Sequence, residues 1–240
     1  MSLARVYSRA AVGVAAPEVT VEVHVGGGLP RISMVGLPQT AVRESKDRVK
    51  AALLNAGFRF PDGLVTIALA PADLPKEGSR FDLPIALGIL AASGQVTDHR
   101  FEDFEFVGEL SLSGGLNPVR GVLPVAVQAG TAGRGLVVPA ASGAEAALAR
   151  NDRTWCAGSL LAVVAWLHGK SQLDRAASVE RLPGTNGKDL ADVYGQARAR
   201  RALEVAAAGS HNLLYSGPPG TGKTMLASRL PGILPPMSEQ

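Results

Sequence analysis

The sequence predicts a mixed α/β protein in two parts, on three observations. Period-two alternation of apolar and polar residues predicts strands near the amino terminus, and helical apolar periodicity appears between and after them. A polar, glycine- and proline-containing stretch then interrupts both patterns. We therefore expect one α/β domain over residues 1–170, a linker over residues 171–188, and the start of a second domain over residues 189–240.

The first strands and the first helix follow from periodicity. Residues 19–25 alternate as a half-buried strand, and residues 31–35 are predicted to return beside it after the turn at residues 26–30. Residues 39–56 have apolar side chains on one face only, which predicts an amphipathic helix. Residues 64–69 predict another strand.

A second helix, residues 82–92, is apolar on every side, so we expect it at the centre of the core. Asp82 is predicted to cap this helix, with Pro84 in its first turn. The remainder of the chain predicts strands and helices in alternation. The strands are expected at 104–112, 135–139, 154–156 and 212–216, and the helices at 122–132, 144–150, 160–167, 197–208 and from 223 to about 230.

Composition excludes several classes of protein. With 46% hydrophobic and 19% charged residues, the 240-residue chain has enough apolar residues for a core and is not disordered throughout. The net charge of +3 is too small to predict a basic nucleic-acid-binding arm. No apolar run approaches the ~20 residues that a membrane helix needs.

A single cysteine, Cys156, excludes an internal disulfide and a cysteine-based zinc cage. It suits a reducing compartment, so a cytoplasmic protein without membrane contacts is expected. The histidines lack the spacing of metal ligands, and no zinc site is predicted at His24, His99, His168 or His211.

The motif G-x-x-x-x-G-K-[ST] occurs once, between a predicted strand and a predicted helix. Glycines in such a loop let successive backbone N–H groups point at phosphate oxygens. The lysine is expected to reach the β- and γ-phosphates of ATP, and the hydroxyl of Thr224 to bind Mg²⁺. The predicted binding residues are Gly217, Pro218, Pro219, Gly220, Thr221, Gly222, Lys223 and Thr224.

Several motifs together resemble one known family. They are VGLP at residues 35–38, LAPADLPKEG at 69–78, RFDLPIA at 80–86, DVYGQ at 192–196, and the phosphate loop with the RLPGILPP that follows it. The chain resembles the magnesium chelatase-like AAA+ ATPases of the YifB/ComM type over nearly its whole length. The first domain is similar to the Lon-protease fold, and the second to the beginning of a P-loop AAA+ domain.

The resemblance implies a function. Val193, Tyr194 and Gln196 would flank the adenine, as the corresponding turn does in AAA+ proteins. ATP and Mg²⁺ are the implied cofactors, and the whole protein is expected to form a homo-oligomeric ring, a hexamer. Members of the family are linked to DNA branch migration during natural transformation, so the resemblance implies a DNA-remodelling ATPase involved in competence.

Residues 225–240 contain no hydrophobic run that ends in Asp-Glu, which a P-loop ATPase needs to hold Mg²⁺ and orient water. We therefore expect the chain to be the amino-terminal part of a longer protein and to hydrolyse no ATP by itself. Two alternatives stay open. One is an oligomerisation or DNA-binding module without catalysis; the other is a metal-chelatase motor subunit, against which the Lon-like first domain argues.

The resemblance to Lon raises the question of a serine–lysine peptidase. Aligned on PKEG, the chain has Arg80 at the nucleophile position, while Ser79 lies one residue early. The position of the expected lysine is occupied by Leu123. A serine without a base to activate it is no nucleophile, so we predict no peptidase activity.

Overall fold

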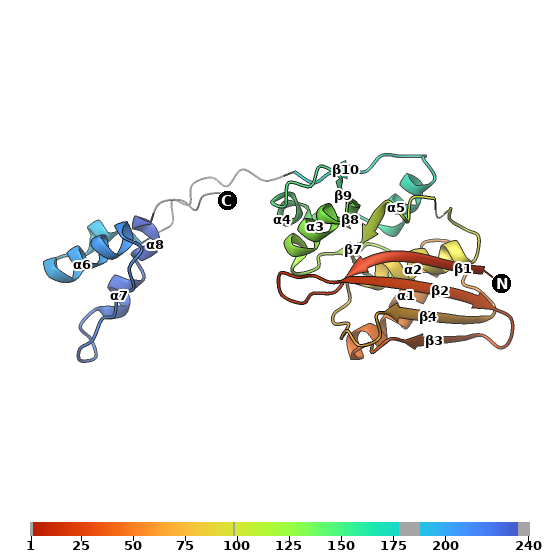
Figure 1. Cartoon of the computed structure of the whole chain (residues 1–240), viewed down its shortest axis with the longest axis horizontal. Helices are drawn as coiled ribbons and strands as arrows, with labels where there is room; N and C mark the ends of the chain where they lie inside the picture. Colours follow the sequence, from red (N-terminus) through yellow and green to blue (C-terminus); the bar gives the residue numbers. More distant parts are fainter. Residues whose placement is uncertain (1, 98, 178–187, 235–240) are drawn as a thin grey trace. The chain divides into compact units, whose positions relative to one another are not determined.

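The computed structural model describes residues 2–97, 99–177 and 188–234 and divides the chain into two compact units, Met1–Val179 and Glu180–Gln240. Each unit is described by itself. The predicted mixed α/β class is confirmed, since strands and helices alternate along the first unit (Figure 1). Among the described residues, no helix is long and apolar enough to cross a membrane.

One sheet forms the framework of the first unit, in the order β10-β9-β8-β5-β1-β2-β4-β3. Four of the pairings between its described strands are parallel and three are antiparallel. Its strands are β1 (Ser2–Arg9), β2 (Glu18–Gly26), β3 (Arg31–Val35), β4 (Leu64–Ala70), β5 (Phe104–Phe106), β8 (Gly135–Pro139), β9 (Thr154–Ala157) and β10 (Asp174–Arg175). The short strands β6 (Glu109–Leu110) and β7 (Leu116–Asn117) pair separately.

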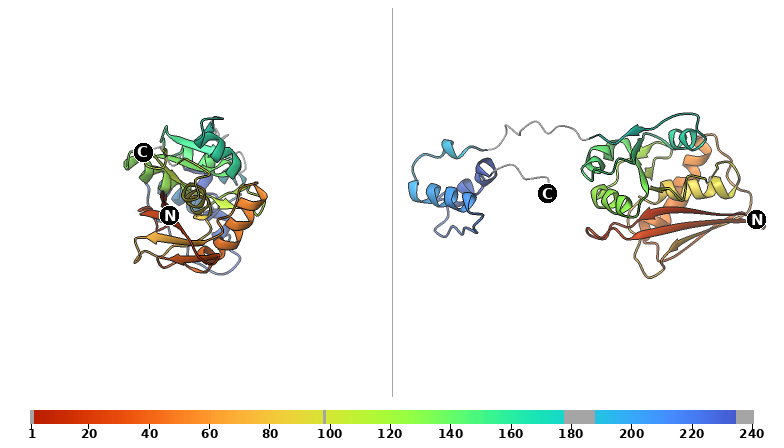
Figure 2. Two further views of the ribbon diagram at one scale, coloured as in Figure 1. Left: turned by 90° about the vertical axis from the view of Figure 1, so that its right-hand side faces the viewer. Right: turned by 45° about the horizontal axis from the view of Figure 1, so that its top comes forward.

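Helices cover the sheet unevenly. The helices of the first unit are α1 (Thr40–Asn55), α2 (Asp82–Ala92), α3 (Val122–Thr131), α4 (Gly143–Ala147) and α5 (Leu160–Leu167). Helices α1 and α2 lie on the same face of β1, β2, β4 and β3 (Figure 2). Strand β8 is covered on both faces: Val137 packs into the cluster around α2, whereas Leu136 and Val138 pack against α3 and α4.

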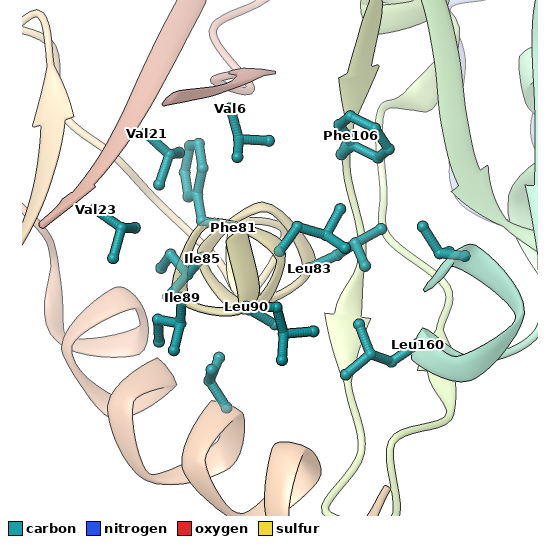
Figure 3. Packing of buried hydrophobic residues seen from close by; sticks show 14 of the residues in the cluster. Val6, Val21, Val23, Phe81, Leu83, Ile85, Ile89, Leu90, Phe106 and Leu160 are labelled. Atoms are coloured by element: carbon teal, nitrogen blue, oxygen red, sulfur yellow. The ribbon is translucent and has the colours of Figure 1, made fainter. Parts of the chain in front are cut away.

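Helix α2 is the centre of the main core, as its apolar sequence predicts. Its side chains meet Val21 and Val23 of β2 on one side and Phe106 of β5 on another (Figure 3). Gly88 lets the helix approach the sheet, because a Cβ there would lie 2.5 Å from Cγ2 of Val23. The other face of β2 carries Thr20, Glu22 and His24, and the strand therefore alternates between core and solvent.

The predicted pairing of β3 is wrong. Residues 31–35 do form a strand, but β3 does not return beside β2; it runs parallel to β4, which lies between them. The chain passes from β3 through α1 into β4, and such a strand–helix–strand crossover produces parallel neighbours. A short glycine-rich turn joins residues 19–25 to residues 31–35, and for this reason the sequence favours a hairpin of these two strands.

Other boundaries differ in detail from the predictions. Strand β1 was not assigned a range of its own, and the predicted strand 104–112 divides into β5 and β6. Asp82 begins α2, but its side chain caps no backbone N–H of that helix; it forms buried contacts with α1 instead. Within the predicted linker 171–188, β10 pairs with β9, while residues 178–187 lie outside the described part.

The second unit contains a 3₁₀ turn η2 (Leu190–Asp192) and helices α6 (Ala197–Ala208), α7 (Lys223–Ala227) and α8 (Leu230–Ile233). A small cluster of Leu190, Val193, Leu203 and Leu226 joins them. The predicted strand at 212–216 is absent, and Leu214 is 89% exposed. A strand needs a neighbour for its backbone hydrogen bonds, and the described residues of this unit supply none.

Candidate functional site

The phosphate-loop motif has the backbone that its glycines predict. The φ angles of Gly217, Gly220 and Gly222 are +153°, +81° and +79°, a region that residues with a side chain rarely adopt. Within the described part of the chain, the N–H groups of residues 220–222 have no hydrogen-bond acceptor. The loop therefore presents unpaired donors, which a phosphate group needs.

Lys223 is folded back onto its own loop. Its ammonium donates to the carbonyl oxygens of Gly217 at 2.9 Å and of Pro218 at 2.7 Å. The hydroxyl of Thr221 donates to the same Pro218 oxygen at 3.0 Å. Pro218 and Pro219 are themselves exposed. These acceptors are neutral, so an incoming phosphate would offer the lysine a stronger, charged partner.

Helix α7 begins at Lys223, and Thr224 lies in its first turn with an exposed side chain. Among the described residues, no hydrogen bond is made by the Thr224 hydroxyl, which leaves it available to an Mg²⁺ ion. The helix is anchored by Leu226, which is buried against the hydrophobic cluster. The residues present therefore fit a nucleotide with its magnesium ion.

One of the three residues predicted to flank the adenine, Gln196, contacts the phosphate loop. Gln196, with a φ of +50°, directs its amide to the carbonyl oxygen of Thr221, and the two atoms are 3.3 Å apart. Val193 is buried, and its carbonyl accepts from Arg200 at 3.0 Å. Tyr194 is 94% exposed and makes none of these contacts. The adenine-flanking role of the three residues stays a prediction.

Tyr215 supports the loop and was not singled out from the sequence. Its hydroxyl donates to the carbonyl oxygen of Ala199 in α6 at 2.8 Å, and its ring packs on the small cluster. The residue comes two positions before Gly217, so it fixes where the chain turns into the loop. The signal in the sequence is an aromatic side chain two residues before the glycine-rich motif.

The residues considered for a peptidase have other partners. The Ser79 hydroxyl donates to the carboxylate of Glu109, a hydrogen bond that lowers the pKa of that carboxyl. Lys76 is buried and donates to the carbonyl oxygen of Pro71, and burial lowers the pKa of its ammonium. In the described part of the chain, no lysine nitrogen is hydrogen-bonded to Ser79.

Arg80, which occupies the Lon nucleophile position, is buried and donates to the carbonyl oxygen of Arg120 at 2.7 Å. Leu123 lies in α3. Asp82 accepts from Ser45 and from Arg48 of α1, the latter with Nε at 2.9 Å from Oδ2. Burial raises the pKa of Asp82, although both contacts oppose that shift. These groups hold α1, α2 and the loop before α2 together.

A metal centre made of protein side chains is not found in the described residues, where no three His, Cys, Asp or Glu side chains gather. Cys156 lies beside Gly143, and burial raises the pKa of its thiol. Within the part of the chain that the structure describes, the phosphate loop combines free N–H donors, a lysine and an available hydroxyl. The fold and the site thus define a mixed α/β protein that carries a phosphate-loop motif.

Comparison with known proteins identifies the family. A family model described as subunit ChlI of Mg-chelatase matches residues 21–142, and a second, described as magnesium chelatase, subunit ChlI, matches residues 189–240. The chain therefore belongs to the magnesium chelatase subunit ChlI family, as its motifs predicted.

Individual relatives match along the whole chain. It is 52% identical over 240 residues to a YifB protein of Salmonella typhimurium, which carries no functional description. It is 52% identical over 244 residues to the competence protein ComM of Haemophilus influenzae, and 49% identical over 240 residues to YifB of Escherichia coli. These matches cover all of this chain but 47%, 48% and 47% of the three relatives. The chain spans about half the length of the curated relatives it matches.

Proposed function

We propose that the chain binds ATP with Mg²⁺ through residues 217–224, and that the whole protein is an AAA+ motor that remodels DNA. The observation that carries the first part is the loop itself: three glycines at positive φ, unpaired N–H donors, and a lysine held by two carbonyl oxygens and the Thr221 hydroxyl, all of them neutral. Bound ATP would supply the free energy of its hydrolysis to such a motor.

The roles of the residues follow from their positions. The N–H groups of residues 220–222 would bind phosphate oxygens, and Lys223 would exchange its carbonyl acceptors for the β- and γ-phosphates. The Thr224 hydroxyl would be a ligand of Mg²⁺. Gln196 would hold the loop through Thr221, while Val193 and Tyr194 would lie near the adenine.

Nucleotide binding is tested with a fluorescent ATP analogue and the purified chain. We expect Mg²⁺-dependent binding that Lys223→Ala weakens by about tenfold or more, because the lysine provides a charge-assisted contact to phosphate. Lys188→Ala is the matched control, since it removes the same charge from an exposed position of the same unit. Equal affinity of the two variants would contradict the proposed site.

The DNA part of the proposal is supported by one relative, whose name describes it as a competence protein. We propose that the whole protein works in the cytoplasm as a ring-shaped hexamer on branched DNA. Affinity for a four-way junction and for a linear duplex, measured against salt with and without ATP, tests it. Equal affinity for both substrates with no effect of ATP would contradict remodelling. Binding without turnover is expected of this chain alone.

A second candidate is the motor subunit of a metal chelatase. It is favoured by the family model that matches residues 21–142, whose description names the chelatase subunit. Because this match lies within the first domain, the Lon-like character of that domain is a weaker argument against a chelatase. The two candidates differ in substrate, so an assay for ATP-dependent insertion of Mg²⁺ into a porphyrin by the whole protein with its partner subunits separates them.

A further inference from the structure

The free edge of the large sheet is an unassigned surface. Among the described residues, strand β3 pairs only with β4 and so ends the sheet (Figure 1). The Arg31 N–H points toward β4, where it donates to the carbonyl oxygen of Gly63 at 3.4 Å. Backbone polar groups alternate in direction along a strand, so those of Ile32 and Met34 point away from β4. Both residues therefore offer a donor and an acceptor at the free edge.

A groove lies beside the beginning of β3. It has a volume of about 500 Å³ and lies between the beginning of β3, the outer side of α1 and the segment before β4. Its apolar lining includes Ile32, Leu54 and Phe60, of which Ile32 and Phe60 also pack against the main core. A groove between an edge strand and a helix is the arrangement in which several domains bind an added peptide strand.

The groove has an excess of positive charge. Arg31, Lys46 and Lys50 line it, and Asp47 and Asp62 are its acidic residues. Within the described residues, none of these five side chains takes part in a salt bridge. The two lysines are four residues apart on α1 and so lie on one side of the helix. Cations that have no carboxylate partner among the described residues, beside free backbone groups, favour an acidic polypeptide.

Exposed apolar side chains flank the same edge. Leu29 precedes β3 and is 88% exposed, Val35 ends it, and Leu37 follows at 61% exposed. Exposed large apolar side chains therefore lie at both ends of the edge strand, where an added strand could contact them. We propose that β3 and the adjoining groove bind an extended acidic segment of a partner protein, which adds to the sheet as a ninth strand. This binding does not depend on the proposed nucleotide site.

Other occupants fit less well. Single-stranded nucleic acid would need a free aromatic face for stacking, but Phe60 is partly buried and the Lys50 ammonium lies 5.5 Å from its ring centroid. A second copy paired edge to edge would bring the cations of two grooves together, and like charges repel. An acidic peptide uses both the free backbone groups and the excess of positive charge.

The test uses the whole 240-residue chain and a fluorescein-labelled decapeptide in which glutamate and valine alternate. We expect binding by fluorescence anisotropy, weakened about tenfold by the double substitution Lys46→Glu/Lys50→Glu, because two attractive charges become repulsive. Lys170→Glu is the control, since Lys170 is exposed and does not line the groove. Hydrogen exchange followed by NMR should show slower exchange at the amides of Ile32 and Met34 with peptide.

Two further probes examine the mode of binding. A decapeptide N-methylated at every residue has lost the N–H groups that a strand needs on both of its edges, so it should bind at least tenfold more weakly. Met34→Pro removes an N–H that points away from β4, toward the free edge, and leaves the hydrogen bonds between β3 and β4 in place. This variant should also bind the peptide more weakly. Circular dichroism verifies that each variant is folded.

Several results would overturn the proposal. They are absence of peptide binding, equal binding of the N-methylated peptide, and equal binding by the lysine-to-glutamate double variant. Displacement of the peptide by an oligothymidylate would assign the groove to nucleic acid instead. Slow exchange at Ile32 and Met34 that increases with protein concentration, without peptide, would assign the edge to a second copy of the chain.

Discussion

The buried ion pair between β1 and β5 gives a prediction whose size follows from the structure. Glu105 is fully buried and receives two hydrogen bonds from Arg9, with Oε2 at 2.6 Å from Nε and Oε1 at 2.8 Å from Nη2. Arg134 lies 3.3 Å from the same Oε1. Removing one partner of a buried pair leaves the other charge unpaired, which costs about 3–5 kcal/mol.

We expect Glu105→Gln to lower the free energy of unfolding of the first unit by about 3 kcal/mol, the lower end of that range, because glutamine still accepts one hydrogen bond. For a unit of this size the midpoint should fall by roughly 6–12 °C. Both tryptophans of the chain, Trp155 and Trp166, lie in the first unit, so intrinsic fluorescence follows its unfolding specifically.

The control is Glu22→Gln. Glu22 pairs with Arg5 at 3.2 Å, but both side chains are substantially exposed, and exposed pairs contribute about 1 kcal/mol or less. The double variant Arg9→Met/Glu105→Met should be more stable than Glu105→Met alone, because no unpaired arginine is left between the strands. If Glu105→Gln destabilised the unit no more than Glu22→Gln, the reasoning about burial would be refuted.

Three other substitutions have definite expected outcomes. Gly36→Ala should destabilise the first unit by about 2–4 kcal/mol in urea unfolding, because the φ is +102° and the new Cβ would lie 2.1 Å from a carbonyl oxygen of β4. Ser79→Ala should raise the pKa of Glu109, measured by NMR titration. Because the folded state lowers the pKa of Glu109, this carboxylate stabilises the fold at pH values above 4.5, the ordinary carboxyl pKa. That contribution is lost as the pH falls through the lowered pKa. The variant should therefore be less stable than the parent chain at neutral pH and nearly as stable at pH 2. Gln196→Gly removes the strain of a positive φ but also removes the contact with Thr221. Affinity for the ATP analogue should therefore fall several-fold, while the unfolding midpoint of the second unit should not fall.

Elements whose signal is local could be predicted from the sequence. The alternation of Val19, Val21 and Val23 identified β2, and the uninterrupted apolar side chains of α2 identified the central helix. The conformation of the phosphate loop also followed from its own glycines, for example the positive φ of Gly220. In each case the deciding interactions lie within a few residues of one another.

Features that depend on distant partners could not be predicted. Asp82 has the sequence context of a helix cap, yet its carboxylate accepts hydrogen bonds from Arg48 and Ser45 of α1, and nothing in the sequence links these positions. The partner of β3 depends on where α1 returns the chain. The unpaired segment before the phosphate loop, which includes the exposed Leu214, has a strand-like sequence without a neighbour to pair with.

For the proposed nucleotide site, the contacts of Lys223 predict the kinetics of association. The ammonium must leave two carbonyl acceptors before it can reach a phosphate, so capture begins with an encounter and continues with a rearrangement of the loop. In stopped-flow experiments the observed rate should then level off as nucleotide concentration rises, at the rate at which the lysine is released. An arginine at this position would hold the loop carbonyls with more donors and should lower that plateau.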